Sequence, residues 1–136
     1  MKKAITYIRV STKMQDVARQ RMKIQEYCDR NNYEIVQEIV DYGISGAKAD
    51  RGGYVKLQSL TDKDGEILVI SELSRLSREE TLITVNTIQN IIYHGLDVIF
   101  LDDASKYYKA NQALNLIELI TLLVSADKNA KERIEI

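Results

Sequence analysis

The sequence contains only one cysteine and one histidine in its 136 residues. Cys28 alone cannot form an internal disulfide, and one cysteine also excludes a zinc site built from several cysteines. With a single histidine, a metal site would have to consist mostly of carboxylates, so we expect no metal. These shortages favour a reduced, cytoplasmic domain.

Long apolar runs and an excess of basic residues are also missing. No apolar run approaches the ~20 residues of a membrane-spanning helix, and the charged start MKK leads into a run too short for a signal peptide. The formal net charge is −1, whereas domains that hold duplex DNA on their own are usually basic. If this chain meets DNA, its basic groups must be concentrated locally, or another domain must hold the DNA.

What is present is an alternation of short apolar segments with segments of helical periodicity. Strands are predicted at residues 4–10, 34–40, 67–70 and 97–101, helices at 16–32, 54–60 and 77–93, and loops at 41–53 and 102–111. The continuous apolar run at 67–70 is typical of a strand buried on both faces of a parallel sheet. The pattern predicts an α/β fold of three layers, in which helices flank a mainly parallel sheet of four or five strands.

The segment from Ala113 to Val124 is apolar on nearly every face of a helix that we predict from about residue 111. Such a helix is either deeply buried or packed against a second subunit. The sequence then turns polar and stops without a helix-ending signal. We therefore expect a fragment of a longer protein, with a frayed natural terminus as the alternative.

Polar residues accompany the ends of three predicted strands, and in a parallel sheet the carboxyl ends of the strands meet at one edge. They are Arg9, Ser11, Gln15 and Gln20 at the first strand, Ser45, Lys48 and Arg51 after the second, and Arg75 and Arg78 after the third. Guanidinium groups match the oxygens of phosphate, and fixed cations stabilise the charge that develops during attack on a phosphodiester. They also ease deprotonation of a serine nucleophile. One serine among four arginines therefore fits phosphodiester chemistry without a metal.

Each of these residues alone has an ordinary structural explanation. Ser11 could cap a helix, and Arg9 could lie on the solvated face of a strand. Arg75 and Arg78 could form a polar helix face. A nucleotide-binding loop is not supported, because no GxxxxGK[ST] or GxGxxG follows the first strand, and His94 is better explained by the dipole of the helix before it than by a Ser-His-Asp site. Only the coincidence at the strand ends points to a site.

Three motifs together carry a resemblance to a known family. They are YIRVST at 7–12 with glutamine at 15 and 20, D-x-G-x-SG-x-K-x-x-R at 41–51, and LSRLSR at 73–78. In order and spacing across residues 4 to about 103, the sequence resembles the catalytic domain of serine site-specific recombinases, the resolvase/invertase family.

The resemblance implies cleavage and rejoining of DNA strands in site-specific recombination, with Ser11 as the nucleophile. Ser11 would become joined to a 5′-phosphate while a 3′-hydroxyl leaves, and this ester would keep the energy needed for rejoining without ATP. Arg9, Arg75 and Arg78 match the arginines that bind the phosphate in the family. No cofactor is implied.

Further positions follow from the same resemblance. Arg51 matches the arginine of the family's mobile loop. Gln15 and Gln20 match polar positions near the nucleophile. We assign Gln20 to the catalytic group, and Gln15 and Lys48 to contact with DNA.

The family's mode of assembly gives the expected organisation of the chain. Its members act as dimers that pair into a tetramer. Residues 1–110 would form the catalytic domain, and 111–136 the start of the dimerisation helix. The sequence ends before any DNA-reading domain, so this part alone would bind double-stranded DNA weakly. The resemblance implies a bacterial cytoplasmic protein that associates with the nucleoid when on DNA, and no membrane partner.

Two positions depart from the family pattern. The family commonly has aspartate before the first arginine of the third motif, where this sequence has Ser74. It also often has a lysine on the short helix after Arg51, where Leu60 or Thr61 stands here, with Lys56 and Lys63 nearby. The alternative is therefore a catalytically degenerate recombinase-like domain that serves oligomerisation or regulation.

Overall fold

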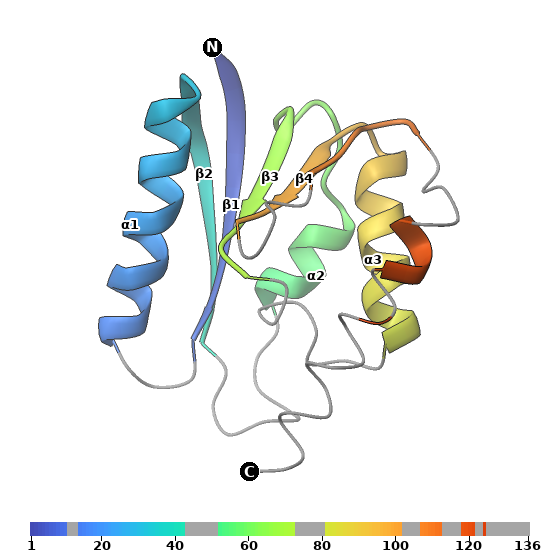
Figure 1. The fold of residues 1–136 in the computed structure, drawn as a ribbon, viewed down its shortest axis with the longest axis horizontal. Coiled ribbons are helices and arrows are strands. Elements are labelled where there is room, and N and C mark those ends of the chain that lie inside the picture. Colours follow the sequence, from blue (N-terminus) through green and yellow to red (C-terminus); the bar gives the residue numbers. More distant parts are fainter. Residues whose placement is uncertain are drawn as a thin grey trace, which may run out of the picture.

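A computed structural model of the chain describes residues 1–10, 14–42, 52–72, 81–101, 107–112, 118–121 and 124. These ranges contain a five-stranded sheet and three helices, with further helical residues at 118–121 and 124. Helices cover both faces of the sheet (Figure 1), which confirms the predicted α/β fold of three layers. Within the same ranges, no helix is both long and apolar enough to cross a membrane.

The sheet is parallel apart from one edge strand. Its strands are β1 (Lys2–Val10), β2 (Tyr33–Tyr42), β3 (Ile67–Ile70), β4 (Asp97–Phe100) and β5 (Tyr107–Tyr108). The order across the sheet is β2-β1-β3-β4-β5, and only β5 runs antiparallel to its neighbour. All four residues of β3 are fully buried, as the continuous apolar run predicts.

Helix α1 (Met14–Arg30) covers one face of the sheet, and α2 (Gly52–Gln58) and α3 (Thr81–Tyr93) cover the other (Figure 1). Under α1 the buried side chains include Ile8, Val17 and Ile24. Under α2 and α3 they include Tyr7 and Ile88. Alternate residues of the central strand β1 therefore enter two different cores.

Strand β5 was not expected, because residues 102–111 read as a polar loop. The strand consists of two residues and pairs with β4, the strand that precedes it in the sequence. The ring of Tyr108 packs edge-on against Phe100 at 6.4 Å between ring centroids. The Tyr107 hydroxyl donates to Asp97, and the backbone N–H of Ala110 donates to the same carboxylate at 2.8 Å.

The expected apolar C-terminal helix lies largely outside the described residues. In the helical residues at 118–121, Leu119 packs against the core beneath α3. Ile120 and Val124 are 52% and 64% exposed. Deep burial therefore does not extend to these two side chains.

Candidate active site at the carboxyl edge of the sheet

The strand order creates a switch point between β1 and β3. The chain leaves β1 through α1 to reach β2 on one side, and crosses through α2 to β3 on the other side. In open parallel sheets, ligands bind in the crevice beyond the carboxyl ends of the strands at such a point. The sequence places Ser11 directly after β1, and Arg75 and Arg78 shortly after β3.

Arg9 lies at this edge, near the end of β1. It is only 8% exposed, and its neighbour across the β1–β2 pairing is Asp41. The explanation of Arg9 as a solvated strand residue is therefore wrong. The alternation along β1 places Arg9 on the same face as Tyr7, beneath α2 and α3.

Gln20 is fully buried and fixes the backbone at the end of β1. Its amide N–H groups donate to the carbonyl oxygen of Arg9 and to Oδ2 of Asp16, each at 3.1 Å. Its Oε1 accepts from the Ser71 hydroxyl at 3.4 Å. Gln20 therefore links α1 to the ends of both β1 and β3.

Asp41 is a buried carboxylate that we did not single out from the sequence. Oδ2 accepts from the Tyr7 hydroxyl at 2.6 Å, and Oδ1 accepts from the backbone N–H of Gly53 at 2.8 Å. A Cβ on Gly53 would lie 2.6 Å from Asp41 Oδ1, so this close approach requires glycine. The only signal in the sequence was the aspartate that opens the motif at 41–51. Asp41 anchors the start of α2, one residue beyond Arg51.

Several predicted site residues fall outside what the structure describes. This holds for Ser11, Lys48, Arg51, Arg75 and Arg78, and for Ser74. Gln15 lies in α1, but its side chain is not described. Of the predicted site, the structure therefore brings together Arg9 and Gln20, with Asp16, Asp41 and Ser71 around them.

Two other reactive residues have structural roles. Cys28 is fully buried, and burial raises the pKa of its thiol to about 11. His94 Nδ1 hydrogen-bonds with the carbonyl oxygen of Leu60 at 3.1 Å, beyond the end of α3. In the described ranges, no cluster of three or more His, Cys, Asp or Glu side chains could hold a metal ion.

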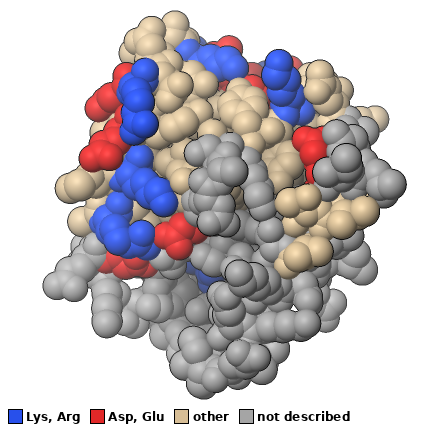
Figure 2. All heavy atoms as spheres, in the orientation of Figure 1, with Lys and Arg blue, Asp and Glu red and all other residues tan. Residues whose placement is uncertain are grey.

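The described surface does not gather charge of one sign on the side shown in Figure 2, where basic and acidic side chains lie interspersed. Some charges of the described residues are paired. Arg21, on α1, contacts Glu38, on β2, at 2.6 Å, and Lys2 contacts Asp97 at 3.2 Å. This agrees with the near-neutral net charge.

The sequence is similar to a known protein family and to a bacterial protein. The sequence matches the family described as "Resolvase, N terminal domain" over residues 4–133. It is 30% identical over 146 residues to the uncharacterized protein YbcK of Escherichia coli (strain K12), and the match covers 96% of this chain and 29% of YbcK.

Solved structures share the fold. The N-terminal catalytic domain of TP901-1 integrase matches with a TM-score of 0.66 and 22% identity over 97% of both chains. A resolvase family site-specific recombinase from Streptococcus pneumoniae matches with a TM-score of 0.64 and 23% identity, over 99% of this chain and 91% of the other.

Proposed function

We propose that this chain, which belongs to the resolvase N-terminal domain family, is the catalytic domain of a serine recombinase that cleaves and rejoins DNA in site-specific recombination. The chain spans 29% of the length of YbcK, so the activity of the whole protein is part of the proposal. The observation that carries it is the buried Arg9, which is fixed at the switch point two residues before Ser11.

In the proposed reaction, the oxygen of the Ser11 hydroxyl attacks a phosphorus atom of the DNA backbone. The new Ser11–phosphate bond forms as the bond from phosphorus to the 3′-oxygen breaks. The proton leaves Ser11, and the departing 3′-oxygen ends as a hydroxyl. The resulting 5′-phosphoserine ester is a covalent protein–DNA intermediate, and attack by a 3′-hydroxyl on this ester rejoins the strands without ATP or another cofactor.

The arginines supply the electrostatic part of this mechanism. Arg9, Arg75 and Arg78 are proposed to contact the phosphate oxygens as negative charge grows on them. A cation that is already fixed stabilises that charge without reorganisation during the reaction. The burial of Arg9 supports this role, because it restricts the side chain before DNA arrives.

The contacts of Gln20 favour a positioning role over the catalytic role expected from the sequence. Its side chain is fully buried, and both ends of its amide are used within the protein. We therefore assign Gln20 to positioning the backbone before Ser11. Gln15 and Lys48 remain candidates for DNA contact. Arg51 is also a candidate for contact with DNA, and it directly precedes α2, whose start is held by the bond from Gly53 to Asp41.

Assembly and DNA binding complete the proposal. Residues 1–110 form the catalytic part, and the segment 111–136 begins a helix that joins two subunits, whose dimers pair into a tetramer. The exposed Ile120 and Val124 support such a contact. The interspersed surface charge supports weak binding of double-stranded DNA by this part alone, with a separate domain holding the DNA in the cytoplasm.

Trapping of the covalent intermediate tests the proposal. We expect the full-length protein to form a covalent adduct with nicked suicide DNA sites, and Ser11→Ala to abolish it. Ser59→Ala is the matched control, because Ser59 is exposed beyond α2 and its hydroxyl contacts only the Lys56 carbonyl among the bonds described. An adduct that survives Ser11→Ala would overturn the assignment. No adduct from an unaltered protein that still assembles on DNA would favour the degenerate domain.

A further inference from the structure

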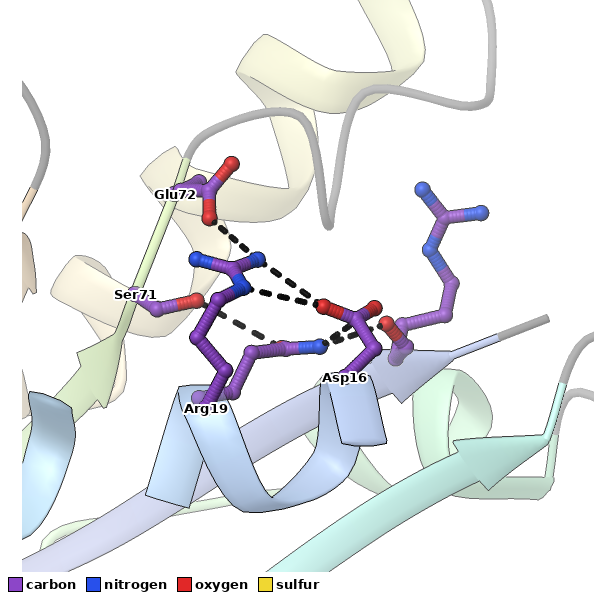
Figure 3. Close-up of polar contacts among 6 residues, drawn as sticks. Asp16, Arg19, Ser71 and Glu72 are labelled. Carbon is purple, nitrogen blue, oxygen red and sulfur yellow. Dashed lines mark hydrogen bonds and ion pairs between the residues drawn. The ribbon is translucent and has the colours of Figure 1, made fainter. Parts of the chain in front are cut away.

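The guanidinium group of Arg19 connects two segments that lie far apart in the sequence. Its Nη2 donates to Oδ1 of Asp16 and to Oε1 of Glu72, each at 2.9 Å, and its Nε donates to Asp16 Oδ1 at 3.2 Å (Figure 3). We call these three residues the Arg19 clamp. Hydrogen bonds with Glu72 and Asp16 raise the pKa of the Arg19 guanidinium, so both contacts favour its charged form.

The two carboxylates of the clamp flank the candidate active site. Asp16 is in the first turn of α1, five residues after Ser11. Glu72 stands two residues beyond the end of β3 and three residues before Arg75. The clamp therefore crosses the switch point between β1 and β3, and in the sequence the proposed nucleophile and phosphate-binding arginines follow these two strands.

Asp16 also connects the Arg19 clamp to the buried hydrogen bonds of Gln20. Asp16 accepts from Arg19 through Oδ1 and from Gln20 through Oδ2. Gln20 in turn holds the carbonyl of Arg9 and the hydroxyl of Ser71 (Figure 3 shows the position of Ser71). The contacts therefore connect Glu72 to Arg9, which lies two residues before Ser11.

We propose that Arg19 is a positioning residue that fixes the segment carrying Ser11 relative to the segment carrying Arg75 and Arg78. This inference rests on the proposed recombinase function. Arginine suits the task because its planar fork can bind two carboxylates at once, which a lysine ammonium does less well. Misplacement of reacting groups by about 1 Å can slow a reaction about 100-fold, so a clamp at this place affects rate strongly.

The same helix offers a matched control. Arg21 also bridges α1 to a strand, through two bonds to Glu38 at 2.6 and 2.8 Å. The exposed fractions of the two arginine side chains are similar, 51% for Arg19 and 49% for Arg21. Exposed ion pairs contribute little to stability, so methionine at either position should have a similar small effect on folding. Only Arg19 lies beside the candidate site.

The test compares Arg19→Met with Arg21→Met in the full-length protein, using single-turnover formation of the covalent adduct at saturating DNA. We expect Arg19→Met to lower the rate about tenfold or more and to leave DNA affinity nearly unchanged, because geometry rather than binding is altered. We expect Arg21→Met to leave both unchanged and Arg19→Lys to restore part of the rate. Equal rates for the two methionine variants would overturn the proposal.

A second variant separates the clamp from direct contact with DNA. Glu72→Gln removes one carboxylate of the clamp and should slow the adduct. The double variant Arg19→Met/Glu72→Gln should lose less than the sum of the two single losses, because each single variant already removes the contact between Arg19 and Glu72. If Arg19 instead contacts DNA, Arg19→Met will weaken DNA binding and Glu72→Gln will not slow cleavage. That outcome would also overturn the proposal.

Failure of the proposed function is visible separately, as the absence of any Ser11-dependent adduct from the unaltered protein. In that case, amide hydrogen exchange in the absence of DNA tests whether Arg19 holds the two segments together. We expect faster exchange in peptides that contain residues 11–16 and 72–80 for Arg19→Met but not for Arg21→Met. Unchanged exchange in both variants would show that Arg19 does not hold the two segments.

Discussion

Replacement of Gln20 by leucine tests whether the buried amide organises the edge of the sheet. Leucine keeps most of the side-chain volume but removes the bonds to the Arg9 carbonyl and Asp16, both 3.1 Å, and the longer 3.4 Å contact with Ser71. Loss of a partner costs a buried polar group about 1–3 kcal/mol. The Arg9 and Ser71 contacts are buried and the Asp16 contact is partly buried, so we expect a loss of about 2–3 kcal/mol in the free energy of unfolding.

Urea denaturation followed by circular dichroism measures this loss. Gln25→Leu on the same helix is the control, because its amide contacts only the exposed Asp29 at 2.9 Å among the bonds described. A surface change of this kind alters stability by about 0.5 kcal/mol or less. If Gln20→Leu destabilises the protein no more than Gln25→Leu, the buried amide does not hold the edge, and the positioning role of Gln20 is wrong.

Three further predictions concern other buried or partly buried groups. Tyr7→Phe removes the 2.6 Å bond to the buried Asp41 carboxylate and should cost about 1.5–3 kcal/mol by urea denaturation, whereas a loss near zero would contradict the anchoring role of Asp41. Burial opposes ionisation of Asp97, but hydrogen bonds from Tyr107 and other donors outweigh it and lower the pKa. The stability that ionised Asp97 adds is therefore fully present above the ordinary pKa of 3.8 and is lost as pH falls through the lower pKa of the folded protein. The loss of stability caused by Asp97→Asn should therefore shrink in acid. A loss that stays constant with pH would refute this. Because burial raises the pKa of Cys28 to about 11, thiol reagents should modify the folded protein about 100-fold or more slowly than the urea-unfolded protein, and equal rates would contradict that burial.

The parts of the fold that local patterns determine were predictable. The buried strand β3 coincides with the apolar run at 67–70, and α1 ends where Asn31 and Asn32 follow it. Asn32 has a φ of 59°, a left-handed conformation that asparagine adopts more readily than most residues at a helix end. By contrast, β5 was not predicted, because two tyrosines within a polar stretch give no strand periodicity, and their pairing with β4 becomes visible only in the structure.

In the candidate site, too, some features follow from sequence patterns and others depend on the fold. Family motifs singled out Arg9 and Gln20 as candidates, but they did not indicate that the Gln20 side chain would be fully buried. The pair of Asp16 and Arg19 is visible as a helix contact at i and i+3, whereas Glu72 joins it across 53 residues of sequence. Periodicity carries no information on such a contact, because it depends on the strand order that brings β1 beside β3.

The chemical identity of the link between protein and DNA tests directly whether Ser11 is the nucleophile. Mass spectrometry of the nuclease- and protease-treated adduct identifies the residue that carries the nucleotide. We predict a 5′-phosphate ester on Ser11 and a free 3′-hydroxyl on the released strand. A nucleotide on one of the eight tyrosines, or a link through a 3′-phosphate, would contradict it.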